Sequence, residues 1–266
     1  MIVRVALTIA GSDPTGGAGL QADLQVFRAF GVHGAGVVTA LTVQDTVKVH
    51  RVLPVFPNVV LEQIRVLLAD VTPHAVKLGM LATDDVARSV GLGLRELDRA
   101  PRPVPIVVDP VLAASDGTRL LEPRARGALE ELIGRCAIVT PNLPEARELS
   151  GCDVSTEEGI EAAGSALVTS LGAGAALVKG GHRDGPPDDL FVVREGGSAS
   201  LTWLRGERIE VGRVHGTGCA LASAITAGLA RGVALREAVE RARRFVANAL
   251  RDAEAVGKMA RLLAFL

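Results

Sequence analysis

Short apolar runs that stop at glycine or at polar residues recur along the chain, with amphipathic segments between them. The first run, residues 3–9, is rich in β-branched side chains and predicts a buried strand. Runs of the same kind predict further strands at residues 36–43, 75–78, 106–108, 137–139 and 175–178. Because strands that alternate with helices form mostly parallel sheets, the pattern predicts an α/β protein with helices on both faces of the sheet.

The intervening segments place their apolar residues at helical spacing. Helices with one apolar face are predicted at residues 20–30, 57–69, 123–133 and 235–250. The last of these directs Arg241, Arg243 and Arg244 outward. After residue 190 the pattern changes, because two short apolar runs at 190–193 and 201–204 are separated by Gly196 and Gly197. This spacing is typical of an antiparallel hairpin, which we expect at an edge of the sheet or as a flap.

One glycine turn leads directly into a helix of small and apolar residues. It consists of His215, Gly216, Thr217, Gly218 and Cys219. The first N–H groups of a helix have no partner inside the helix and lie at the positive end of its dipole, so the turn is a candidate anion site. The alternative is that the glycines only make a tight turn and that the cysteine is one more small buried residue.

A second glycine-rich loop, residues 11–19, follows the first predicted strand. It is not a Walker A loop, because Gly16 is followed by Gly17 and Ala18 where the lysine and the hydroxyl residue would stand. It also lacks the spacing of a dinucleotide fingerprint. Asp23 lies in the first turn of the helix that follows, where a surface carboxylate favoured by the helix dipole is the structural alternative to a functional role.

Several polar residues stand at the ends of the predicted strands. Since ligands bind at the carboxyl ends of strands in open α/β sheets, we expect these side chains to share a site. They are Gln44, Asp109, Asn142, Glu145 and Lys179. Asn142 and Glu145 also have the spacing of a capping box, so both have a purely structural interpretation.

Composition narrows the function classes. The chain has 266 residues, of which 48% are hydrophobic, and no linker divides it, so we expect one domain over residues 1–266. No apolar run approaches the length of a membrane span and no signal peptide is evident, so we expect a cytoplasmic protein without a membrane partner. A net charge of −1 argues against nucleic-acid binding. Three widely spaced cysteines argue against a disulfide framework or a zinc site.

Taken together, the motifs resemble the hydroxymethylpyrimidine/phosphomethylpyrimidine kinases of thiamin biosynthesis, within the ribokinase-like fold. The match follows the family's order from residue 6 to about residue 231 and includes the loop at 11–19, residues 39–46, 109–111, 140–146, 179–182 and 215–219. Departures at Asp45, Leu112, Ala220 and residues 212–214 remove no catalytic group that the family uses. The resemblance implies a three-layer α/β sandwich, a homodimer, and ATP-dependent phosphorylation of 4-amino-5-hydroxymethyl-2-methylpyrimidine and its monophosphate. It also implies Mg²⁺ and leaves a monovalent cation open.

The resemblance assigns roles to particular residues. It implies that Asp23 and Gln44 bind the nitrogens of the pyrimidine, and that Gly11 and the backbone of Val107 lie beside it. It implies that Asn142 and Glu145 orient Mg²⁺ through water, that Lys179 reaches the ATP phosphates and that Asp109 lines the same site. Gly216, Thr217 and Gly218 would bind the moving phosphoryl group. Cys219, at a helix N-terminus that favours thiolate, would take the proton of the alcohol.

Three alternatives remain at this point. The protein could be a pyridoxal or pyridoxine kinase, since that substrate is also a nitrogen heterocycle with a hydroxymethyl group. It could be a module that binds the pyrimidine without phosphorylating it, although binding alone would not require Asn142, Glu145, Lys179 and Cys219 together. A cysteine hydrolase is disfavoured, because neither His182 nor His215 has a sequence context that ties it to the thiol as a base.

Overall fold

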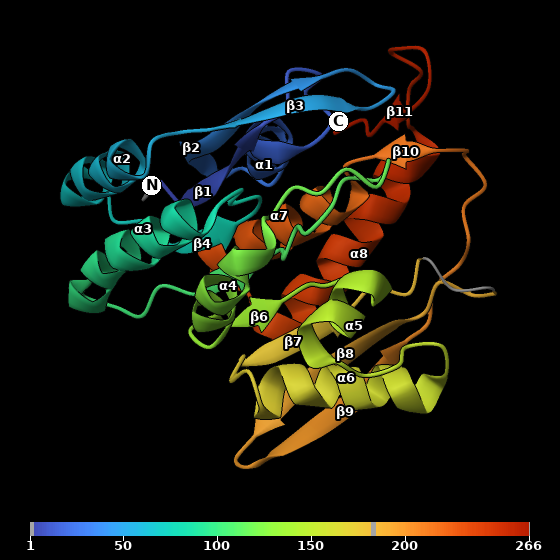
Figure 1. Cartoon of the computed structure of the whole chain (residues 1–266). Coiled ribbons are helices and arrows are strands. Elements are labelled where there is room, and N and C mark those ends of the chain that lie inside the picture. The colour runs from blue at the N-terminus through green and yellow to red at the C-terminus, as the bar shows by residue number, and fades with distance from the viewer. Residues whose placement is uncertain (1–2, 182–184, 266) are drawn as a thin grey trace.

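The computed structural model describes residues 3–181 and 185–265, and a nine-stranded sheet forms its centre (Figure 1). The strands lie in the order β3-β2-β1-β4-β5-β6-β7-β8-β9. The parallel strands are β1 (Val5–Ser12), β2 (His33–Gln44), β4 (Ala75–Leu78), β5 (Ile106–Val108), β6 (Ile138–Val139) and β7 (Ala175–Val178). The antiparallel strands are β3 (Val49–Pro54), β8 (Asp189–Glu195) and β9 (Ser198–Leu204). The prediction of a mostly parallel sheet is confirmed.

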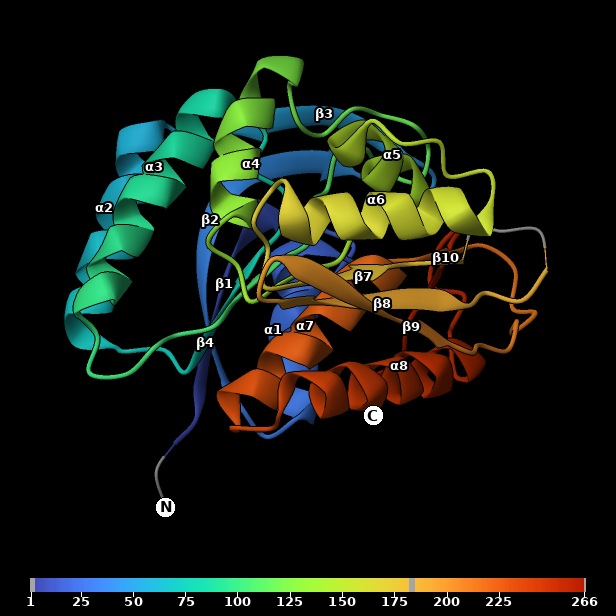
Figure 2. The same cartoon turned by 90° about the horizontal axis from the view of Figure 1, so that it is seen from below.

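Helices cover both faces of the sheet, so the molecule has three layers (Figure 2). One face carries α1 (Gly19–Ala29), α7 (Thr217–Ala230) and α8 (Leu235–Arg251). The other carries α2 (Pro57–Asp70), α3 (Asp84–Leu94), α4 (Arg126–Ile133), α5 (Leu143–Ser150) and α6 (Glu157–Thr169), with short 3₁₀ turns at Arg95–Arg99 and Pro123–Ala125. This arrangement matches the expected α/β sandwich.

The strands from β4 to β7 are short, and each is buried on both sides. All residues of β4, β5, β6 and β7 are inaccessible to solvent or nearly so. Buried away from water, the backbone N–H and C=O groups of these apolar stretches form their hydrogen bonds within the sheet. The chain leaves the sheet where glycine or polar residues begin. The predicted strand ends at Leu78, Val108 and Val139 are therefore confirmed, and the functional side chains that follow them are brought to one edge.

The predicted hairpin is β8 and β9, and it continues the main sheet beyond β7. Edge strand β3 was not predicted, because exposed polar residues such as His50 and Arg51 interrupt its apolar pattern. A small second sheet joins β10 (Val214–His215) to β11 (Arg261–Leu262) and carries the C-terminal segment across to the glycine turn. None of the helices in the described part of the chain combines the length and the apolar character that crossing a membrane requires.

Candidate active site

A cavity of about 940 Å³ opens at the carboxyl ends of the parallel strands. Its walls come from residues in or just after β1, β2, β5, β6 and β7, together with the start of α7 and residues of α8. Ten of the residues singled out in the sequence line it: Gly11, Gln44, Asp109, Asn142, Glu145, Lys179, Gly216, Thr217, Gly218 and Cys219. His182, which belongs to the same motif as Lys179, lies outside the described residues.

The glycine turn forms the N-terminus of α7. Gly216 is the N-cap and has a φ of 82°, and a side chain there would also collide with the carbonyl oxygen of Gly17. No side chain caps the helix, so the N–H groups of Thr217, Gly218 and Cys219 have no capping side chain as a partner. Because the helix dipole is positive at this end, the turn has the geometry of an anion site.

Lys179 brings a positive charge to the same place. A β-carbon built on Gly218 would lie 3.0 Å from Lys179 Nζ, so glycine lets the ammonium group approach the helix N-terminus closely. Nζ donates to Asp109 Oδ1 at 3.1 Å and lies 3.9 Å from Glu145 Oε2. Burial lowers the pKa of Lys179, but the Asp109 and Glu145 carboxylates outweigh burial and raise it. The Lys179 ammonium group is therefore held in place and stays charged.

Asn142 and Glu145 form the predicted capping box at the start of α5. Asn142 Oδ1 accepts from the Glu145 N–H at 2.8 Å, and Glu145 Oε2 accepts from the Asn142 N–H at 2.7 Å. Burial and the nearby Asp109 carboxylate raise the pKa of Glu145 to about 7, although Lys179 opposes them. The structural interpretation of this pair is thus correct, and the pair also lines the cavity.

The described residues contain no group of three or more histidine, cysteine or acidic side chains that could hold a metal ion directly. Two buried carboxylates, Asp109 and Glu145, and the amide of Asn142 do face the cavity. Burial raises the pKa of Asp109, but Lys179 and Lys77 outweigh burial and lower it, so this carboxylate is ionised. Such oxygen donors suit a hard cation that keeps most of its water ligands.

The expectation that Cys219 is a thiolate is wrong for this site. Burial raises the pKa of the thiol to about 12, despite the opposing effect of Lys77. The Gly19 backbone N–H and Lys77 favour the thiolate form of Cys219, but burial and the Asp109 and Asp23 carboxylates outweigh them, so the thiol keeps its proton. Asp109 is ionised and can only accept, so it is a candidate acceptor for that proton.

The structure also corrects two residues expected beside the pyrimidine. Asp23 is fully buried below the cavity and does not line it. Its carboxylate pairs with Lys77 Nζ at 2.8 and 2.9 Å and accepts from Thr8 and Ser223, each at 2.6 Å. Val107 lies inside β5, where the sheet uses its backbone, and does not line the cavity either. Both residues are fully buried and contribute no surface to the cavity.

Two contributors to the cavity wall were not among the predicted site residues: Lys77, for which the sequence left a buried base or a rim position open, and Arg243. Lys77 is fully buried in β4 yet borders the cavity, and a lone lysine in an apolar run gave no sign of its partner. Arg243 was expected to point outward, but its Nε donates to Asp189 Oδ2 at 2.7 Å. Its Nη2 donates to the carbonyls of Leu204 and Arg205 at 2.8 and 2.9 Å. Arg243 therefore links α8 to the β8–β9 hairpin in the wall of the cavity.

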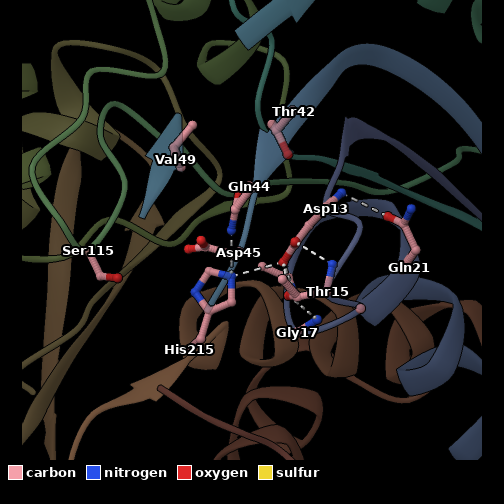
Figure 3. Close-up of polar contacts among 12 residues, drawn as sticks. Asp13, Thr15, Gly17, Gln21, Thr42, Gln44, Asp45, Val49, Ser115 and His215 are labelled. Atoms are coloured by element: carbon pink, nitrogen blue, oxygen red, sulfur yellow. Dashed lines mark hydrogen bonds and ion pairs between the residues drawn. The ribbon is translucent and has the colours of Figure 1, made fainter. Parts of the chain in front are cut away.

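A polar cluster in the cavity wall includes Asp13 of the loop at 11–19, Gln44 and His215 (Figure 3). His215 Nε2 is 2.9 Å from Asp13 Oδ2 and 3.0 Å from Gln44 Nε2. Asp13 is buried and holds the loop by accepting from the Thr15 N–H and from the Ala18 N–H. The cluster joins the ends of β1 and β2 to His215, the first residue of the glycine turn.

Comparisons with known proteins agree with this geometry. A sequence model of the family described as phosphomethylpyrimidine kinase matches residues 13–263. The chain belongs to this family. A hydroxymethylpyrimidine/phosphomethylpyrimidine kinase of Rhizobium meliloti (strain 1021) is 42% identical over 255 residues, which cover 95% of this chain and 92% of that protein.

Solved structures extend the likeness of this phosphomethylpyrimidine kinase family member to the whole fold. Phosphomethylpyrimidine kinase from Clostridium difficile 630 is 35% identical with a TM-score of 0.80, over 93% of this chain and 99% of that chain. Pyridoxal kinase from Bacillus subtilis, solved as an ADP complex, is 29% identical with a TM-score of 0.87, over 99% and 98% of the two chains. The fold is thus the ribokinase-like α/β fold, and it is common to kinases of two heterocyclic alcohols.

Proposed function

We propose that the protein is an ATP-dependent kinase that phosphorylates 4-amino-5-hydroxymethyl-2-methylpyrimidine and then its monophosphate, in the formation of the pyrimidine part of thiamin. Family membership supports the activity. The observation that carries the proposal is that the N-terminus of α7, Lys179 and Asp109 meet in one cavity. Phosphoryl transfer depends on positioning and on stabilising charge at the moving group, and these residues supply the donors and the positive charge that it needs.

In this proposal the N–H groups of Thr217, Gly218 and Cys219 bind the equatorial oxygens of the transferring phosphoryl group. Lys179 Nζ, which Asp109 holds beside Gly218, adds a positive charge as negative charge moves toward the leaving ADP. These groups are already in place before the substrates bind, so they need no reorganisation during the reaction. That property favours the transition state over the ground state.

The proton of the alcohol has a path through Cys219 to Asp109. As the alcohol oxygen bonds to the γ-phosphorus, its proton passes to the Cys219 sulfur while the thiol proton passes to the Asp109 carboxylate. The bond from the γ-phosphorus to ADP breaks in the same event, so atoms and charge balance. This path replaces the expected thiolate base, because the thiol carries its proton in the free protein and Asp109 is the ionised acceptor.

We propose that Mg²⁺ binds with ATP near Asp109, Glu145 and Asn142. When bound, the ion neutralises phosphate charge and helps to orient the transferring group. The buried carboxylates and the amide are oxygen donors of the kind it prefers, and contact through water fits the absence of a three-residue cluster among the described residues. A requirement for a monovalent cation stays an expectation of the resemblance alone.

We further propose that the chain is one kinase domain, works in the cytoplasm and forms a homodimer. The continuous sheet from β3 to β9 supports a single domain. Exposed apolar side chains on paired strands β2 and β3 support a dimer, since Leu41, Val43 and Leu53 are 52%, 45% and 40% exposed. Sedimentation of the wild type beside a Leu41→Lys/Leu53→Lys variant tests it, because a dimer through this face should become monomeric.

Pyridoxal kinase activity is the second candidate, and the high structural similarity to the Bacillus subtilis enzyme favours keeping it. The first experiment measures ADP formation with ATP, Mg²⁺ and either the hydroxymethylpyrimidine or its monophosphate, and identifies the products by mass. We expect both to be phosphorylated. Binding of the pyrimidine without ADP formation above background would instead support a non-catalytic module.

A further inference from the structure

Gln44, His215 and Asp13 form a hydrogen-bonded chain that phosphoryl transfer does not use (Figure 3). All three line the cavity, and they come from the end of β2, from β10 and from the loop after β1. The side chains of Asp13 and His215 are only 5% and 17% exposed. A buried polar chain of this kind has to satisfy its donors and acceptors, so its protonation can be worked out from its partners.

The carboxylate of Asp13 sets the first constraint. Oδ1 accepts from the Thr15 N–H at 2.9 Å, and Oδ2 accepts from the Thr15 hydroxyl at 2.9 Å and from the Ala18 N–H at 3.0 Å. Burial raises the pKa of Asp13, but its hydrogen bonds with His215 and Thr15 outweigh burial and lower it. The group is therefore ionised and can only accept. His215 Nε2, 2.9 Å from Oδ2, must carry a proton.

This proton constrains Gln44 in turn. The atom of Gln44 nearest to His215 Nε2 is the amide nitrogen, at 3.0 Å. Two N–H donors cannot bond each other, whereas the amide oxygen could share the Nε2–H with Asp13. A half-turn about the last bond of the glutamine side chain exchanges its oxygen and nitrogen without moving anything else, and the hydrogen-bond partners decide between the two orientations.

We propose that His215, held by Asp13, is a positioning residue that turns the Gln44 amide oxygen toward itself and leaves the NH₂ group for the substrate. The amide oxygen keeps a second lone pair, so Gln44 offers a donor and an acceptor side by side. This pair is complementary to a ring nitrogen next to an exocyclic amino group. The opposite orientation would be complementary to a ring N–H next to an oxo group.

The Asp13–His215 pair therefore makes the site prefer amino heterocycles to their oxo counterparts. This proposal rests on the proposed function of the protein as a kinase of an aminopyrimidine. The backbone around the pair supports a fixed orientation. Val214 and His215 pair with Arg261 and Leu262 of β11, and the Asp13 N–H donates to Gln21 Oε1 at 3.0 Å. Both members of the pair are thus held by elements that are distant in sequence from Gln44.

The first test reads the proton of His215 in the free wild-type protein. Long-range ¹H–¹⁵N spectra distinguish a protonated from an unprotonated Nε2, and the signals are assigned by their loss in His215→Phe. We expect a protonated Nε2. An unprotonated Nε2 facing Gln44 overturns the proposal, whatever the enzyme's activity, so this outcome is separate from a failure of the proposed function.

The second test compares kcat/KM for the aminopyrimidine with that for its 4-oxo analogue, in the wild type, in His215→Phe and in the matched control His50→Phe. His50 is an exposed residue of edge strand β3, contacts Asp45 and does not line the cavity. We expect His215→Phe to lower the preference for the amino substrate by about tenfold or more, mainly through KM, with little change in the KM for ATP. The control should keep the wild-type preference. An unchanged preference in His215→Phe contradicts the proposal, whereas a wild type inactive with both compounds contradicts the proposed function alone.

Discussion

Asp23 shows how burial determines the role of a residue. Near the start of a helix it could have been a surface carboxylate or a substrate ligand, yet it is the buried partner of Lys77, 54 positions away. The interpretation of Cys219 changed for the same reason. A helix N-terminus favours the thiolate, but burial raises the pKa of the thiol and keeps it protonated. Residues at strand ends, such as Asp109 and Lys179, could be placed correctly because a local pattern locates them. Partners that are distant in sequence have no such pattern.

Removing the charge of Asp23 should destabilise the protein rather than impair substrate binding. Asp23→Asn leaves the Lys77 ammonium buried without its counter-ion, so we expect a loss of about 3–5 kcal/mol in the free energy of unfolding, measured by urea titration. Asp23→Asn/Lys77→Met removes both charges and should recover much of the loss. A selective rise in the KM for the pyrimidine with unchanged stability would contradict this expectation and support a role of Asp23 in substrate binding.

Replacing Cys219 should affect turnover far more than binding. Cys219→Ala interrupts the proton path to Asp109, so we expect kcat to fall on the order of 10²-fold while the KM values for ATP and the pyrimidine change little. Cys152→Ala is the matched control, since Cys152 is half-buried and does not line the cavity. An unchanged kcat in Cys219→Ala would show that the helix N-terminus and Lys179 suffice.

The elements follow their sequence patterns where one face or both faces are buried. The helices at α1, α2 and α8 and the strands from β4 to β7 were predictable for this reason. Strand β3 was not, because its outer face is exposed and interrupted by charge. The two-residue strands β10 and β11 were beyond prediction, because their pairing joins Val214 to Arg261 through tertiary structure alone.

The cap of α5 should make stability depend on pH. The pKa of Glu145 is raised from 4.5 to about 7 in the folded protein. A carboxyl of this kind stabilises the fold fully below its ordinary pKa, and this contribution is lost as the pH rises through about 7. Glu145→Gln cannot titrate, so the stability of the wild type relative to this variant should fall between about pH 5 and about pH 8. Urea unfolding at each pH measures it, and a constant difference would contradict the raised pKa.

At the scale of the whole molecule, the fold class followed from the alternation of strands and helices, whereas the order of the strands did not. The order decides which loops meet, and here it brings residues from β1, β2, β5, β6 and β7 around the start of α7. The chemistry of the cavity, with helix N–H groups, a lysine and buried carboxylates, is that of a phosphoryl transferase. We propose that the alcohol substrate is selected where Gln44 and His215 line this cavity.

The most direct measurement is a competition in which the wild type, ATP and Mg²⁺ react with equal concentrations of the hydroxymethylpyrimidine and pyridoxal. The phosphorylated products are quantified by mass at low conversion, so their ratio reports the ratio of kcat/KM values. We expect the phosphorylated pyrimidine to predominate by about tenfold or more. Predominance of phosphorylated pyridoxal, or the absence of both products, would contradict it.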